Sequence, residues 1–213
     1  MKMLSQGEYW SREAENFDAI YSHKKNKLSV ILDKVFRKAM YDRFTFSMEQ
    51  SEPITKKTFL DFGCGTGLFS LELARRGAIR VTGIDVAPRM IEICKYRAKE
   101  QGLQHNTDFI LSNILQFAPK ERFDIGICMG VLDYIKAPLP ELSRMKELTK
   151  EKVMLSFPVL WNWRTLPRLI RLRLKRCPVY FYTKKQIRKL MQAAGFSKVV
   201  YRKMGPMYFV TAS

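Results

Sequence analysis

The stretch KTFLDFGCGTGLFSLELARRG, residues 57–77, decides the fold of this chain. Its opening, TFLDF, is an apolar run typical of a buried strand, and GLFSLELARRG carries apolar residues at helical spacing. The turn GCGTG between them has glycines at 63, 65 and 67, where the backbone can bend sharply and a ligand can approach closely. In an open parallel sheet, ligands gather at the carboxyl ends of the strands. The stretch therefore predicts a ligand-binding turn after the first strand of an α/β sheet.

The alternation of strands and helices continues along the chain. Further apolar runs predict strands at 80–86, 107–114, 123–130 and 152–158, and amphipathic patterns predict helices at 88–102, 139–150 and 183–196. The final runs, 197–204 and 207–213, are joined by Gly205 and Pro206 and predict an antiparallel hairpin. We expect a mostly parallel sheet with helices on both faces. The single domain would comprise four parts: an N-terminal helical cap (1–56), a core (57–158), a basic lid insert (159–182) and a C-terminal helix with hairpin (183–213).

Length and composition favour one domain with a proper core, because 46% of the 213 residues are hydrophobic. No uncharged apolar run approaches the roughly 18–20 residues of a membrane span, and the first residues contain no apolar signal core. The cysteines are spread singly along the chain, at Cys64, Cys94, Cys128 and Cys177. We therefore predict a reduced cytoplasmic protein without a disulfide framework or a metal site.

The positive charge of the chain is concentrated near its C-terminus. The formal net charge is +18 at pH 7, and residues 159–213 contain 13 lysines and arginines but no aspartate or glutamate. The positive electrostatic field of such a segment attracts phosphates, anionic lipid or acidic substrates.

Three ligands compete for the glycine turn. A phosphate-binding Walker loop needs a lysine after its glycines, and a dinucleotide turn has the spacing GxGxxG, whereas this turn reads GxGxG. Asp61 precedes the turn, where it would repel a pyrophosphate but could hold an ammonium group. Asp85 ends the next strand, where a carboxylate can accept both hydroxyls of a ribose. A ribose, an ammonium and no phosphate describe S-adenosylmethionine.

Several motifs in order resemble those of class I methyltransferases: LDFGCGTG, GIDVAPRMIE, LSNIL, FDIGICMGVLDYI and AGF. The resemblance covers about residues 57–213 and implies a Rossmann-like, seven-stranded fold. The N-terminal pattern EYW…FDAIYS is more loosely similar to small-molecule methyltransferases of the ubiquinone and magnesium-protoporphyrin type. The cofactor-binding residues that the resemblance implies are Asp61, Gly63, Cys64, Gly65, Gly67, Asp85, Val86, Asn113, Met129 and Gly130. Of these, Asn113 would reach the adenine amino group, although Ser112 stands where the family more often has an acid.

Methyl transfer from a sulfonium mainly requires alignment of the nucleophile and exclusion of water, and a hydroxyl acceptor also gains from a general base. The candidate catalytic residues are Asp133, Tyr134 and His23. Asp133 could equally cap a helix or form a surface ion pair, and His23 could be a solvated residue beside two lysines. The sequence CMGVLD contains no [DN]PP[YF] motif, which disfavours amino methylation of DNA bases. We expect a hydroxyl or amine of a small molecule, a glycan or a lipid-linked compound as acceptor.

The basic insert has three interpretations. It could be a lid with solvated arginines, a lid that binds an anionic or membrane-borne acceptor at an anionic bilayer, or an RNA-binding segment. The candidate substrate-binding residues are Trp161, Trp163, Arg164, Arg168 and Arg171. Two alternative functions follow: an RNA methyltransferase, or a non-catalytic protein that only binds the cofactor.

Overall fold

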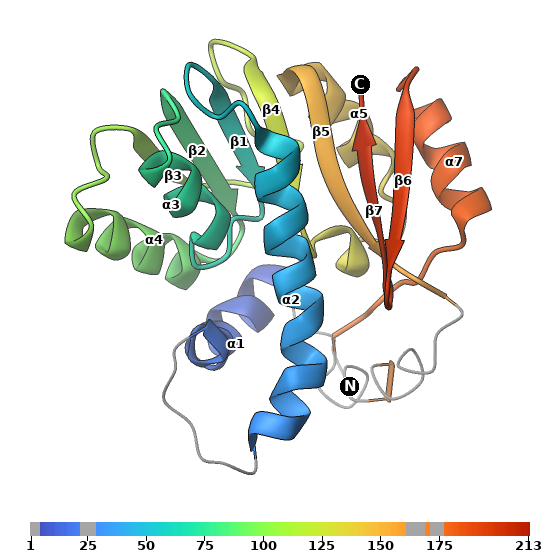
Figure 1. The fold of residues 1–213 in the computed structure, drawn as a ribbon, viewed down its shortest axis with the longest axis horizontal. Helices are drawn as coiled ribbons and strands as arrows, with labels where there is room; N and C mark the ends of the chain where they lie inside the picture. Colours follow the sequence, from blue (N-terminus) through green and yellow to red (C-terminus); the bar gives the residue numbers. More distant parts are fainter. Residues whose placement is uncertain (1–4, 22–28, 161–168, 171–176) are drawn as a thin grey trace.

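A computed structural model of the chain describes residues 5–21, 29–160, 169–170 and 177–213, without the side chains of residues 15–39. Two helices, α1 (Gln6–Tyr21) and α2 (Ser29–Ser51), precede a seven-stranded sheet (Figure 1). The strands are β1 (Thr58–Phe62), β2 (Arg80–Asp85), β3 (Thr107–Leu111), β4 (Phe123–Cys128), β5 (Thr149–Pro158), β6 (Val199–Met204) and β7 (Met207–Ala212).

The strand order is β3-β2-β1-β4-β5-β7-β6. The first five strands in this order are parallel to one another, whereas β7 is antiparallel to both β5 and β6. The predicted mostly parallel sheet with an antiparallel C-terminal hairpin is thereby confirmed. The strand order reverses between β1 and β4, and this reversal opens a crevice at the carboxyl ends of those strands.

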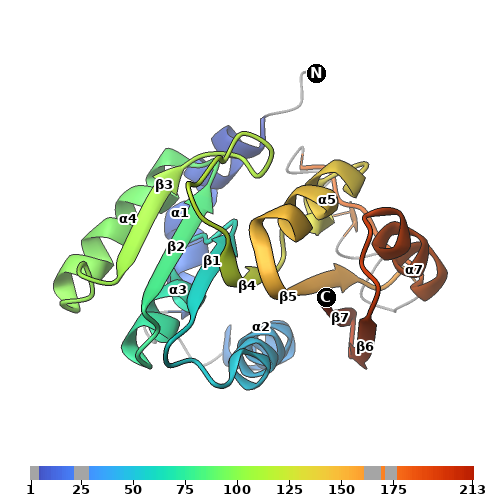
Figure 2. The same ribbon diagram turned by 90° about the horizontal axis from the view of Figure 1, so that it is seen from above.

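The helices that follow the strands cover both faces of the sheet (Figure 2). They are α3 (Leu68–Arg75), α4 (Pro88–Glu100), α5 (Leu139–Leu148) and α7 (Lys184–Ala193). Alternate strand residues belong to two separate core clusters, as Phe59 and Leu60 show for β1. One cluster includes side chains of α2, α3 and α4, and the other includes side chains of α5 and α7.

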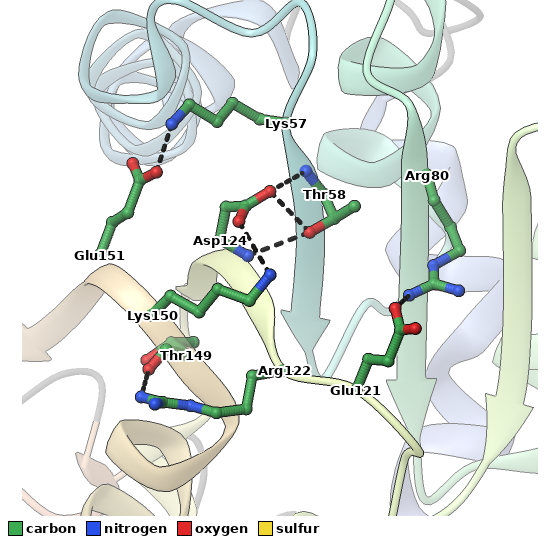
Figure 3. Close-up of polar contacts among 9 residues, drawn as sticks. All are labelled: Lys57, Thr58, Arg80, Glu121, Arg122, Asp124, Thr149, Lys150 and Glu151. Carbon is green, nitrogen blue, oxygen red and sulfur yellow. Dashed lines mark hydrogen bonds and ion pairs between the residues drawn. The ribbon is translucent and has the colours of Figure 1, made fainter.

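Polar contacts join the amino-terminal ends of the strands, at the end of the sheet opposite the crevice (Figure 3). Asp124, at the start of β4, accepts hydrogen bonds of 2.8 Å from both the backbone N–H and the hydroxyl of Thr58 at the start of β1. Lys150 lies 3.3 Å from the other oxygen of Asp124, and Lys57 pairs with Glu151. The strand beginnings are thus connected by side chains, which leaves the carboxyl ends for a ligand.

Several element boundaries differ from those predicted, and two of the differences have a visible cause. Strand β3 ends at Leu111 instead of residue 114, because the Asn113 side chain accepts a hydrogen bond from the Gln116 N–H and closes a turn there. Helix α5 ends at Leu148, and Thr149 already begins β5. The predicted helix at 183–196 starts where expected, since Thr183 and Gln186 form a capping box at α7.

Candidate functional site

A cavity of about 370 Å³ lies at the carboxyl ends of the central strands. Its wall combines the glycine turn after β1, the ends of β2, β3 and β4, and residues of α1, α2 and α5. A volume of this size falls within the range of about 300–1,000 Å³ that is usual for small-molecule sites. The cavity is therefore at the position that the glycine turn predicted.

The glycine turn is held against the end of β2. The N–H groups of Gly63 and Cys64 both donate to the carbonyl of Ile84, at 2.8 and 3.0 Å. Gly63 has φ +73°, and a Cβ there would overlap the Cγ2 of Val131. Gly65, with φ +54°, lines the cavity together with Gly63 and Cys64. Glycine at 63 is thus required by the close approach of the segment after β4.

Asp85 joins the turn to β2 through its carboxylate. One oxygen accepts a hydrogen bond of 3.0 Å from the Gly65 N–H, and the other accepts one of 2.9 Å from the Ala87 N–H. Burial raises the pKa of this carboxyl, while the backbone hydrogen bonds oppose that rise. Each carboxylate oxygen keeps a further lone pair, and Asp85 lines the cavity, so the fixed carboxylate can accept hydroxyl donors from a ligand.

Two predicted cofactor-binding residues lie behind the turn and not on the cavity wall. Asp61 is 1% exposed and accepts a hydrogen bond of 2.7 Å from the Ser70 hydroxyl, because β1 runs through the middle of the sheet. Burial raises the pKa of Asp61 to about 7. Gly67, with φ +84°, forms the start of α3 and packs near Cys94 and Leu71. Both residues therefore support the turn from behind.

Val86 and Asn113, which follow β2 and β3, also line the cavity. Val86 is 40% exposed, which leaves an apolar surface for a flat ring to cover. The Asn113 amide group, by contrast, is engaged within its own loop: its Nδ2 donates to Gln116 Oε1 at 2.7 Å, and its Oδ1 accepts from the Gln116 N–H at 2.8 Å.

A cation that the sequence analysis missed lies at the end of β4. Arg43, on α2, lines the cavity beside Met129 and Gly130. A Cβ at Gly130 would lie 2.7 Å from Nη1 of Arg43, so this glycine makes room for the guanidinium group. The N–H of Gly130 donates to the Ser156 hydroxyl at 2.9 Å, which fixes the backbone at this point. Nothing in the spacing of the sequence distinguishes Arg43 from the other basic residues of the N-terminal cap.

The candidate catalytic residues lie at different depths. Asp133 is fully buried, and its carboxylate lies 3.6 Å from the Arg43 guanidinium behind the cavity wall. Tyr134 does line the cavity, where its ring packs edge-on against Trp10 with 5.1 Å between the ring centroids. His23 lies outside the described residues, as do the predicted substrate-binding residues Trp161, Trp163, Arg164, Arg168 and Arg171.

Two cysteines meet beside the glycine turn. The sulfur of Cys64 lies 3.9 Å from the sulfur of Cys94, which donates to the Gly65 carbonyl at 3.1 Å. All four cysteines are buried thiols. Within the described residues, no group of three or more His, Cys, Asp or Glu side chains could hold a metal ion, and no helix is long and apolar enough to cross a membrane.

Comparison with known proteins gives consistent matches in sequence. A family model described as a methyltransferase domain matches residues 55–195. A ubiquinone biosynthesis O-methyltransferase of Histophilus somni is 34% identical over 124 residues, which cover 55% of this chain and 51% of the relative. A protein of the same name from Cereibacter sphaeroides is 32% identical over 143 residues, which cover 67% and 55%. The chain thus spans about half the length of the curated relatives it matches.

Solved structures match the fold over most of the chain. A magnesium protoporphyrin IX methyltransferase of Synechocystis with bound S-adenosylhomocysteine superimposes with a TM-score of 0.77 and 20% identity, covering 97% of this chain and 96% of that chain. The N-methyltransferase NodS of Bradyrhizobium japonicum, in complex with S-adenosylhomocysteine, gives a TM-score of 0.60 and 18% identity, with 82% and 86% covered. At these identities the likeness concerns the fold.

Proposed function

The chain belongs to the class I S-adenosylmethionine-dependent methyltransferases, and we propose that it transfers the methyl group of this cofactor to a hydroxyl or amine of a small-molecule, glycan or lipid-linked acceptor. The observation that carries the proposal is the fixed carboxylate of Asp85, which faces a cavity of about 370 Å³ beside the glycine turn. Acceptors with a hydroxyl group are favoured because the curated relatives are O-methyltransferases.

The chemistry of the cavity fits S-adenosylmethionine. Gly63 and Gly65 present backbone without side chains, so the methionine part can lie close to the turn. Asp85 would accept the ribose hydroxyls, and the exposed surface of Val86 would cover one face of the adenine. The guanidinium of Arg43 would bind the methionine carboxylate, since arginine matches carboxylates in a bidentate manner. The cofactor supplies an electrophilic methyl group on a sulfonium.

The protein's own part is mainly alignment and exclusion of water. Met129 and Gly130 line the cavity at the end of β4, and Trp10 with Tyr134 closes it on the side of α1. We assign Asp133 a positioning role, because its carboxylate faces Arg43 and not the cavity. Tyr134 is then the described candidate that can contact the acceptor directly.

Calorimetric titration of S-adenosylhomocysteine into the pure protein tests the cofactor assignment. We expect wild-type binding at micromolar strength and at least a tenfold loss in Asp85→Ala, which corresponds to about 1.4 kcal/mol. Asp108→Ala is the matched control, because Asp108 is exposed on β3 and does not line the cavity. Equal binding by the two variants, or no binding by the folded wild type, would contradict the assignment. Binding without transfer to any hydroxyl or amine acceptor would favour a non-catalytic role.

We also propose that the basic C-terminal part of the molecule contacts an anionic surface, such as a membrane that carries the acceptor. Helix α7 exposes four cations on its outer face: Lys184, Lys185, Arg188 and Lys189. This face would attract phosphate groups. An RNA partner would use the same charges.

A further inference from the structure

Helix α4 holds the glycine turn from behind through two side-chain donors. The thiol of Cys94 donates to the Gly65 carbonyl at 3.1 Å. The Nη1 atom of Arg97 donates to the Thr66 carbonyl, also at 3.1 Å. The two donors are three residues apart and therefore lie on the same face of the helix. Two consecutive carbonyls of the turn are thus directed toward α4.

The contact between α4 and the turn is close. A Cβ on Gly67 would lie 3.1 Å from the sulfur of Cys94, which is tighter than an ordinary van der Waals contact. The same sulfur lies 3.9 Å from the sulfur of Cys64, and the side chain of Cys94 is fully buried. A change at Cys94 is therefore transmitted directly to the backbone of the turn.

The direction of these carbonyls decides what the turn can offer to a ligand. In a trans peptide the C=O and N–H groups point in opposite directions. With the Gly65 carbonyl directed toward α4, the N–H of Thr66 points away from α4. Thr66 is 1% exposed and lines the cavity, and its Oγ1 has no hydrogen-bond partner within the described part of the chain. Both the N–H and the hydroxyl of Thr66 can donate to a ligand oxygen.

We propose that Cys94 and Arg97 are positioning residues of the cofactor site, because they hold the turn so that Thr66 can donate to the carboxylate of the cofactor's methionine part. This inference rests on the proposed cofactor. A carboxylate has two oxygens, so Thr66 and Arg43 can both donate to it. Cys94 and Arg97 do not belong to the described cavity wall, and they act on the ligand only through the turn. Arg97 has the larger effect, because a hydrogen bond from a charged donor is stronger than one from a thiol.

The test compares two ligands by calorimetry: S-adenosylhomocysteine, and 5′-methylthioadenosine, which keeps the adenosine and the sulfur but lacks the amino acid part. We expect the wild type to bind S-adenosylhomocysteine at least about tenfold more tightly. In Arg97→Met the affinity for S-adenosylhomocysteine should fall at least about fivefold. Cys94→Ala should weaken it at least about fourfold, whereas Cys94→Ser, which keeps a donor, should change it less than about twofold. The affinity for 5′-methylthioadenosine should stay within about twofold of the wild type in each variant, which also shows that the variant is folded.

Lys95→Met is the matched control for the loss of a positive charge, because Lys95 is exposed on α4. It should bind both ligands as the wild type does. The inference is overturned if Arg97→Met or Cys94→Ala leaves the ratio of the two affinities unchanged. It is also overturned if Cys94→Ser binds as weakly as Cys94→Ala, or if Lys95→Met changes the ratio as much as Arg97→Met.

Failure of this inference is distinguishable from failure of the proposed function. Both ligands contain the ribose, so Asp85→Ala should weaken both of them. If it does so while the α4 variants leave the ratio of affinities unchanged, only the positioning role is wrong. If the folded wild type binds neither ligand, the cofactor assignment is wrong as well.

Discussion

At the residue scale, the unusual feature is a carboxyl in the middle of the sheet. Burial raises the pKa of Asp61 to about 7, although the hydrogen bond from Ser70 acts in the opposite direction. In the unfolded chain this carboxyl ionises near its ordinary value of 3.8. Between these values the folded protein holds a proton that the unfolded chain has released. The free energy of unfolding contributed by Asp61 therefore falls as the pH rises from about 4 to about 7.

We predict that Asp61→Asn removes this dependence. Asparagine can still accept the hydrogen bond from Ser70 but carries no charge. The wild type should lose about 2–3 kcal/mol of unfolding free energy between pH 5 and pH 8 that the variant does not lose, since each pH unit corresponds to 1.36 kcal/mol. Urea denaturation at both pH values measures the change. A difference between variant and wild type that is the same at pH 5 and pH 8 would contradict it. Ser70→Ala removes the hydrogen bond that lowers the pKa of Asp61, so the pH range over which stability is lost should move to higher pH.

At the scale of elements, the close approach of the glycine turn to the segment after β4 shapes the site. Gly63 and Gly102 have similar positive φ angles, +73° and +66°. A Cβ on Gly63 would overlap Val131, whereas a Cβ on Gly102, in the loop after α4, would meet no atom within 4 Å. The two positions therefore share the same backbone requirement and differ in packing.

We predict that Gly102→Ala lowers the unfolding free energy by about 1 kcal/mol, the cost of the backbone conformation alone. Gly63→Ala should lose at least about 2 kcal/mol more, because its Cβ would overlap the β-branched side chain of Val131, which has few rotamers. Chemical denaturation of both variants measures this difference. Val131→Ala in the Gly63→Ala background should restore part of the loss. Equal losses at positions 63 and 102 would show that the contact between the turn and Val131 is unimportant.

At the scale of the whole molecule, the basic helix α7 and the cavity lie at different parts of the sheet. The cavity lies at β1 to β4, whereas the basic helix α7 packs at the other end, beside β6 and β7 (Figure 1). An anionic surface could therefore be contacted by α7 without covering the cofactor. This arrangement suits an enzyme that receives its acceptor from such a surface.

We predict that the protein sediments with vesicles of phosphatidylglycerol at low salt and stays in solution with phosphatidylcholine or at high salt. Charge reversal at Lys184, Lys185 and Lys189 should weaken the partitioning at least tenfold, given about 1 kcal/mol per cation at such a surface. The control reverses three exposed lysines away from α7, namely Lys95, Lys99 and Lys120. If both triple variants bind equally, α7 is not the contact surface. If added RNA releases the protein from the vesicles, RNA binds more tightly than the membrane, and the interpretation of the basic segment as RNA-binding is favoured.

The sequence by itself determined the architecture and the place of the site. Strand and helix periodicities predicted every strand of the sheet, because the hydrophobic pattern of each element is local and buried strands read as continuous apolar runs. The glycine turn and Asp85 were also predictable, since a sharp turn and a strand end have fixed positions relative to each other in this type of unit. The charge of the C-terminal segment was likewise a property of composition.

Only the tertiary structure brought Arg43 and Glu141 to the cavity. They come from helices on opposite faces of the sheet, and no spacing in the sequence measures a distance between such elements. The structure also decided that Asp61 is buried behind the turn and that the Asn113 amide is engaged by Gln116. The physical reason is common to these cases. Whether a polar side chain is available to a ligand depends on which neighbours already satisfy its hydrogen bonds, and those neighbours are fixed by packing.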